Sequence, residues 1–270
     1  MAHQIRQLSL GGVLDEAIAL TKEHFGALFR IVAVTMLPPL LIVSFYQFAV
    51  MPQLTFPFQQ EQFVAWMEAQ QKHGNIINVL SIASAVATIL GNAAVVHGVS
   101  CAALGQPFTT KAALSQALKI FLPLIGTSVL GGLAVFVGTL LCIIPGIIVT
   151  LWFAFTTPIV VIEGVGGIDA LKRSKTLTEG NLGSMFVCGA VVAVIQLGVV
   201  AAPHLVPQPH AAIVLGAVVQ CALQIFSSAA VVMFYFSARC QHEQFDLQLL
   251  VDAVEAEIVL EADDEEKQAT

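Results

Sequence analysis

Six long apolar blocks constrain this chain more than any other feature of its sequence. They lie at about residues 27–50, 76–100, 120–143, 147–162, 182–202 and 211–236. A helix needs about 20 apolar residues to cross the hydrocarbon core of a bilayer, and the blocks are close to that length. Only 11% of the residues are charged, whereas a soluble domain carries roughly 25%. The sequence therefore predicts an all-α, polytopic membrane protein with six transmembrane helices.

Proline and glycine residues mark where these helices should bend or end. Pro38 and Pro39 should kink the first transmembrane helix, because proline removes a backbone hydrogen bond. Gly74 is expected to end a short surface helix at 59–73. Pro145 and Gly146 lie between the third and fourth blocks and predict a tight turn there. These two blocks should therefore form a hairpin.

Amphipathic segments precede the first, third and fifth blocks, at 10–25, 110–119 and 166–181. Apolar residues recur at helical spacing in these segments, which predicts short helices lying on the membrane surface. The segment from Leu20 to Phe29 also aligns without gaps with the segment from Leu177 to Phe186, sharing Leu, Thr, Gly and Phe. This pattern predicts a unit of one surface helix and two transmembrane helices, used three times. Chance similarity between apolar segments is the alternative.

The basic residues of the loops predict an orientation. Of the 11 Lys and Arg residues, only Lys72 falls on the side of the membrane opposite the termini. Because positive residues favour the cytoplasmic side, the termini and the surface helices should be cytoplasmic. Residues 1–260 should form a single transmembrane domain, and residues 261–270 should form a disordered acidic tail.

Polar residues follow one face of two of the predicted helices. In the second block they are Asn78, Ser81, Ser84, Thr88 and Asn92, and in the sixth block they are Gly216, Gln220, Gln224 and Ser228. These faces are a candidate polar path, carried by Asn78, Ser81, Thr88, Asn92, Gln220 and Gln224. Helix packing is the alternative, because small and hydroxyl side chains let membrane helices approach and hydrogen-bond. For the same reason, Ser128 and Gly132 of the third block predict close helix packing.

Motifs that carry catalysis are not found in the sequence. The chain lacks a CxxC pair, an HExxH motif, a Walker loop, a GxSxG elbow and a GxGxxG loop. We therefore expect a protein that is not an enzyme, with no catalytic residues, no cofactor and no metal. A basic patch of the kind that binds nucleic acid is also missing, so nucleic acid is not an expected partner.

The segment from Pro145 to Phe186 carries a resemblance to a known family. Its residues are Pro145-Gly146-Ile147-Ile148, Pro158, Glu163-Gly164, Ala170-Leu171-Lys172-Arg173-Ser174, Leu177 and Gly180. This pattern resembles the membrane domain of some bacterial glycerophosphoryl diester phosphodiesterases and the related YciC-like inner-membrane proteins. The resemblance implies a six-helix module of the bacterial inner (plasma) membrane. The phosphodiesterase catalytic barrel has no counterpart here, so that activity is not implied.

Four charged residues of this segment and one serine are the candidate lipid or partner contacts: Glu163, Lys172, Arg173, Lys175 and Ser174. A charge within hydrocarbon costs about 3 kcal/mol or more, so Glu163 should lie at the interface or pair with Arg173 or Lys175. The leading hypothesis is a non-catalytic protein that binds membrane lipid or a protein partner, or forms a homo-oligomer, in envelope homeostasis. The alternative is a small transporter or channel for an unidentified solute.

Overall fold

The computed structural model describes residues 8–52, 60–201, 206, 208–245 and 247–248. Over these residues the chain is helical and contains no β-strand. Five helices are long and apolar enough to cross a membrane, and a bent pair of helices makes a sixth candidate. The predicted all-α, polytopic fold is therefore confirmed. The predicted acidic tail at 261–270 lies outside the described residues.

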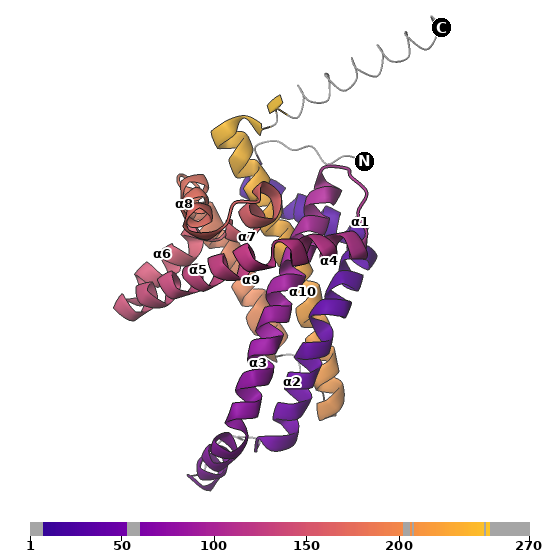
Figure 1. The fold of residues 1–270 in the computed structure, drawn as a ribbon, viewed down its shortest axis with the longest axis vertical. Helices are drawn as coiled ribbons and strands as arrows, with labels where there is room; N and C mark the ends of the chain where they lie inside the picture. Colours follow the sequence, from indigo (N-terminus) through magenta and orange to yellow (C-terminus); the bar gives the residue numbers. More distant parts are fainter. Residues whose placement is uncertain (1–7, 53–59, 202–205, 207, 246, 249–270) are drawn as a thin grey trace, which may run out of the picture.

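The long helices form an elongated bundle (Figure 1). In chain order the elements are α1 (Leu10–Thr35), α2 (Leu37–Val50), α3 (Gln60–Ala103), α4 (Thr110–Lys119), α5 (Phe121–Leu141), α6 (Ile143–Trp152), α7 (Thr156–Pro158), the π-helical turn η1 (Ile159–Glu163), α8 (Gly167–Thr178), α9 (Leu182–Ala201) and α10 (Pro209–Glu243). Helices α1, α2, α3 and α10 pack against one another along the long axis of the molecule. The α5–α6 hairpin projects sideways from this bundle.

Helix α1 lies in the core of the bundle, which corrects the prediction of a separate surface helix at 10–25. Val13, Ala17 and Leu20 are fully buried, and α1 packs against α10, α3 and α4. The Ser237 hydroxyl of α10 also accepts a hydrogen bond from the Leu8 backbone N–H (2.9 Å). The amphipathic stripe was identified correctly, but its apolar face contacts protein rather than lipid.

The predicted proline kink is confirmed, whereas the predicted helix end at Gly74 is wrong. Helices α1 and α2 meet at Met36 and are bent by 50°, immediately before Pro38 and Pro39. Gly74 lies within α3, a continuous helix of 44 residues. At 1.5 Å per residue such a helix is about 66 Å long. Helix α3 is therefore much longer than the ~30 Å of hydrocarbon that it must cross.

The α5–α6 hairpin forms as predicted, but its turn lies at Cys142 rather than at Pro145-Gly146. Cys142 is a single extended residue between the two helices (φ −172°, ψ 156°). Pro145 lies in the first turn of α6, where its missing N–H costs nothing. Gly146 instead lets the helices touch, since a Cβ atom there would lie 2.9 Å from the Thr139 Cα. A Cβ atom on Gly132 would meet no atom within 4 Å, so close packing at Ser128 and Gly132 is not observed.

Gly146→Ala should therefore destabilise the protein by about 1–3 kcal/mol, the usual cost of overpacking. The added methyl group would press on the Thr139 backbone, which cannot rotate away as a flexible side chain can. Thermal unfolding in detergent measures the loss, followed by the fluorescence of the two Trp residues, of which Trp152 ends α6. Gly132→Ala is the matched control and should be neutral or slightly stabilising, because alanine favours helix over glycine. Equal midpoints for the two variants would contradict the tight hairpin contact.

Two of the predicted surface helices are observed as short, separate helices. Helix α4 has the predicted bounds, and the Thr109 side chain caps it by accepting from the Ala112 N–H. Helix α8 ends before Gly180, which adopts a positive φ of 89°. Helix α4 precedes the α5–α6 hairpin and α8 precedes α9 and α10, whereas α1 continues into its span. The threefold repeat stays a prediction.

Candidate functional site

The fourth apolar segment, at Ile143–Glu163, is broken near its middle. Helix α6 ends at Trp152, and Phe153 and Phe155 leave the helical conformation before α7 begins. Pro158 has no N–H to bond the carbonyl group of Ala154, which weakens the helix at this point. The segment then winds into the π-helical turn η1 and stops at Gly164, where φ is 71°. The break leaves backbone groups that other parts of the chain must satisfy.

Ser174 of α8 provides hydrogen bonds to two backbone groups at the break. Its fully buried hydroxyl accepts a hydrogen bond from the Phe155 N–H (3.1 Å) and donates one to the Trp152 carbonyl (2.7 Å). The serine of the family-like motif thus joins α8 to the fourth segment. The structure gives this candidate lipid contact a place inside the protein rather than on its surface.

Ser174→Ala should lower the free energy of unfolding by about 1–3 kcal/mol, because it leaves the buried Phe155 N–H and the part-buried Trp152 carbonyl without their side-chain partner. Denaturation in mixed detergent micelles, followed by circular dichroism, gives this value. Thr176→Ala is the matched control on the same helix, since the exposed Thr176 hydroxyl bonds only its own helix at Lys172. A Ser174 variant as stable as the Thr176 variant would mean that the break needs no such support.

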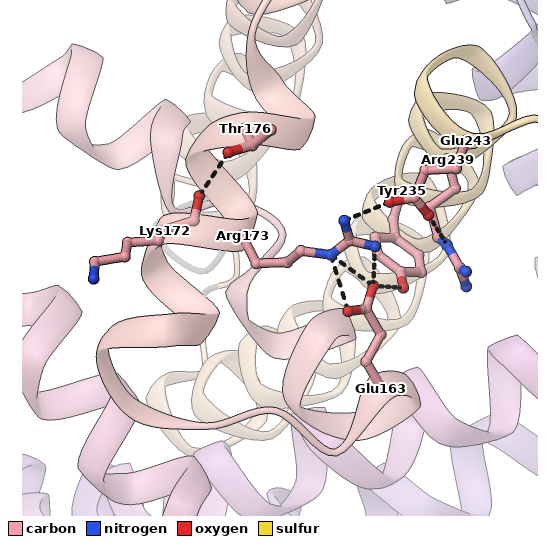
Figure 2. A network of polar contacts seen from close by, with 7 residues as sticks. All are labelled: Glu163, Lys172, Arg173, Thr176, Tyr235, Arg239 and Glu243. Carbon is pink, nitrogen blue, oxygen red and sulfur yellow. Dashed lines mark hydrogen bonds and ion pairs between the residues drawn. The ribbon is translucent and has the colours of Figure 1, made fainter.

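Five side chains form a charged clasp between η1, α8 and α10, shown in Figure 2: Glu163, Arg173, Tyr235, Arg239 and Glu243. The Arg173 Nε lies 3.0 Å from the Glu163 Oε2, and its Nη2 donates to the Glu163 Oε1 (3.2 Å). The Tyr235 hydroxyl donates to the same Oε1 (2.6 Å). Glu163 is therefore paired with Arg173, one of the two partners expected for it.

At the other end of the clasp, Arg173 of α8 is bound to side chains of α10. Its Nη1 pairs with the Glu243 Oε1, and the Glu243 Oε2 lies 2.9 Å from the Arg239 Nε. Hydrogen bonds from Glu243 and Glu163 raise the pKa of the Arg173 guanidinium above its ordinary value, so it stays charged. The exposed fractions of these four charged side chains are only 16–31%. Two acids and two bases thus neutralise one another.

Sequence reasoning missed three members of the clasp, namely Tyr235, Arg239 and Glu243. A signal was present, because these residues follow one another at steps of four and therefore share one face of a helix. The remaining members, Glu163 and Arg173, were among the candidate contacts. In the structure these two side chains bind each other, and each also binds a side chain of α10.

The two lysines of α8 lie outside the clasp. Lys172 and Lys175 are exposed, and Lys172 points away from the clasp in Figure 2. The Lys175 Nζ lies 4.5 Å from the centre of the Trp152 ring. Helix α8 therefore has one face bound to the protein through Arg173 and Ser174, and another that presents lysines.

An apolar cavity of about 520 Å³ lies between α5, the broken segment, α9 and α10. A second cavity of about 390 Å³ adjoins it between the α5–α6 hairpin and α9, and both are lined by Thr150, Leu151 and Gly189. The larger cavity is also lined by hydroxyl side chains, including Thr127 and Thr156. The two cavities lie between the hairpin and α9, beside the contact of α6 with α9.

The residues of the candidate polar path fall into separate groups. The Asn92 Oδ1 accepts from the Gln224 side chain (3.2 Å) and from the Ser228 hydroxyl (2.9 Å), which joins α3 to α10. Gln220 instead accepts from Gln196 of α9 (2.7 Å). Gln196 was not among the residues singled out from the sequence.

The remaining path residues lie farther along α3. Asn78 and Thr88 are exposed, Ser81 is half-buried, and the Thr88 hydroxyl bonds the Ser84 carbonyl of its own helix (2.8 Å). In the described part of the chain, no three His, Cys, Asp or Glu side chains gather closely enough to hold a metal ion.

Comparison with known proteins gives one match. No curated protein and no solved structure matches the chain. A family model described as a domain of unknown function, DUF7847, matches residues 64–239. The match runs from the first part of α3 to Arg239, so it contains Ser174 and every member of the clasp except Glu243. Because it covers well over half of the sequence, the chain belongs to the DUF7847 family.

Proposed function

We propose that this chain is a non-catalytic protein of the bacterial inner membrane, with cytoplasmic termini, that binds a membrane lipid in envelope homeostasis. The apolar cavity between the α5–α6 hairpin, α9 and α10 is the observation that carries this proposal. The excess of basic residues in the loops on the side of the termini supports the orientation. The resemblance to the phosphodiesterase membrane domain supports the bacterial inner membrane.

The cavity suits the acyl chain of a lipid. Its volume of about 520 Å³ falls within the roughly 300–1,000 Å³ of small-molecule sites. Its lining is mostly apolar, with valine, leucine and phenylalanine side chains beside small residues such as Gly131 and Gly189. An apolar chain gains free energy in proportion to the apolar area that it buries. The adjoining cavity along α6 and α9 would extend the same path.

The lysines of α8 suit an anionic headgroup. Lys175 lies over the ring of Trp152. Trp152 is the next residue after Leu151, which lines the cavity. Lys172 lies three residues before Lys175, so the two exposed lysines fall on the same side of α8, and Lys172 points away from the clasp in Figure 2. A basic residue beside an anionic membrane surface contributes about 1 kcal/mol. A lipid with its chain in the cavity would therefore bring its phosphate group towards these lysines.

Native mass spectrometry of the purified full chain tests the proposal. The protein is first stripped of lipid in detergent and then mixed with phosphatidylglycerol or phosphatidylcholine of equal chain length. One retained lipid per chain is expected, with phosphatidylglycerol retained more strongly. The proposal would be overturned if neither lipid stayed bound more strongly than the detergent does.

Replacing both lysines, Lys172→Gln and Lys175→Gln, should weaken phosphatidylglycerol binding by about 2 kcal/mol, or roughly 30-fold. Phosphatidylcholine binding should change little, because that headgroup has no net charge. The control replaces Lys111 and Lys119 of α4 with Gln, which removes the same charge from another short helix. Titration with each lipid gives the affinities. An equal loss in both double variants would assign the effect to net charge rather than to α8.

A small transporter or channel is the second candidate, and the broken fourth segment favours it. Broken helices form the substrate sites of many transporters. In that case Asn78→Cys, Thr88→Cys and Asn92→Cys should all react with a water-soluble maleimide from a continuous aqueous path. In the lipid-binding case Asn92→Cys should stay unreactive, because Asn92 lies in a packed contact with Gln224 and Ser228.

A further inference from the structure

The tip of the α5–α6 hairpin has the wrong chemistry for a loop in water. The two residues on each side of Cys142 are exposed and apolar: Leu140 and Leu141 are each 76% exposed, Ile143 71% and Ile144 67%. Residues 120–162 contain no Asp, Glu, Lys or Arg. A helix that crosses the bilayer usually has aromatic or charged anchors where it reaches the interface. This tip has neither.

The backbone of the tip departs from the helical conformation at one residue only. Irregular backbone does not occur in contact with lipid tails, because its polar groups would be left without partners. Here the turn is a single residue, and hydrogen bonds continue on both sides of it. The Cys142 N–H donates to the Gly138 carbonyl (3.2 Å), and the Gly146 N–H donates to the Cys142 carbonyl (3.3 Å). The close contact at Gly146 holds the two helices together beside the turn.

The hairpin is attached to the rest of the protein at its base, beside α8. The Gly167 N–H donates to the Thr127 hydroxyl (2.6 Å), and Leu171 of α8 would contact a Cβ atom on Gly131. In Figure 1 the hairpin runs away from the long helices α3 and α10 instead of alongside them. Its base lies near the end of the molecule where α8 and the charged clasp are found.

We infer that the α5–α6 hairpin enters the membrane from the α8 side, ends within the hydrocarbon and returns to the same side. Its partner is the acyl-chain layer of one leaflet. Helix α5 has 21 residues and is about 31 Å long, so it would reach the far interface only if it stood upright. Because the hairpin leaves on the side from which it enters, the two termini stay on one side.

Cys142 provides a native probe at the tip. The labelling is done in two sets of sealed vesicles, each of which exposes one side of the protein to the reagent. Because the chain has other cysteines, the labelling of Cys142→Ala is subtracted from that of wild type, and the difference reports the Cys142 thiol alone. Gln71→Cys in the Cys142→Ala background marks the opposite side, since Gln71 is exposed on the outer part of α3. A water-soluble maleimide should label Gln71→Cys and leave Cys142 unlabelled from both sides. Labelling of Cys142 from the side that labels Gln71→Cys would overturn the inference.

A second readout needs no thiol reaction. Leu141→Trp adds a fluorophore at the tip, and its signal is the difference from wild type, which has two Trp residues. Lipids brominated at the middle of the chain should quench this signal at least twofold more than lipids brominated near the headgroup. The opposite order of quenching would place the tip at an interface and contradict a hairpin that ends in hydrocarbon. Lipid retention in the cavity is a separate measurement, so the two proposals can fail independently.

Discussion

Gly189→Leu is expected to lower lipid retention at least tenfold while leaving the fold intact. Gly189 lines both apolar cavities, and a Cβ atom added there would meet no atom within 4 Å. The leucine side chain can therefore enter the space without pushing on the backbone. It would occupy volume that an acyl chain needs and remove the burial that stabilises the bound chain. Native mass spectrometry with titrated phosphatidylglycerol measures the change.

Gly198→Leu is the matched control for this substitution. Gly198 lies on the same helix, is exposed, and also has open space at its Cβ position, but it does not line either cavity. Its lipid retention should equal that of wild type. Thermal unfolding of both variants shows whether the fold is kept. If Gly189→Leu folds normally and binds lipid as wild type does, the cavity is not the lipid site.

Arg173→Gln should lower the free energy of unfolding by about 2–3 kcal/mol. Removing one partner of a buried ion pair costs about 3–5 kcal/mol, and the clasp is part-exposed, so a smaller loss is expected. The substitution leaves Glu163 and Glu243 without their shared cation, although Tyr235 and Arg239 still donate to them. It also removes the ion pair that joins α8 to α10. Denaturation in mixed micelles gives the value.

The neighbouring Lys172→Gln is the control, because Lys172 is exposed and points away from the clasp. It should change stability by less than about 0.5 kcal/mol. A double-mutant cycle with Glu163→Gln isolates the contact itself, and contacting residues of this kind couple by about 0.5–3 kcal/mol. Additive effects of Glu163→Gln and Arg173→Gln would show that the two side chains do not stabilise one another.

The clasp changes how the basic residues of α8 should be tested. Charge reversal at Arg173 would break the protein's internal contacts as well as any contact with lipid, so a loss of lipid binding could not be attributed. Lys172 and Lys175 lack that ambiguity, because neither belongs to the clasp. They are the residues through which α8 can meet an anionic surface.

Many helices of this fold were predictable from the sequence, for a local reason. Hydropathy, amphipathic spacing and capping residues act within one segment, so the bounds of α4 and the position of α9 follow closely from the residues in them. The kink before Pro38 follows from the chemistry of proline itself. Gly74 failed as a helix end because glycine permits a left-handed residue without requiring one.

The sequence by itself determined that the chain is helical, apolar and long enough to span a membrane several times. Only the tertiary structure decided that α1 is buried, that Ser174 supports a broken helix, and which partners Glu163 takes. The contact of Glu163 with Tyr235 joins residues 72 positions apart. Such pairs depend on how helices cross, and a periodic pattern within one helix does not contain that information. The cavities have the same origin, because they lie where α9 and the hairpin do not fill the space between them.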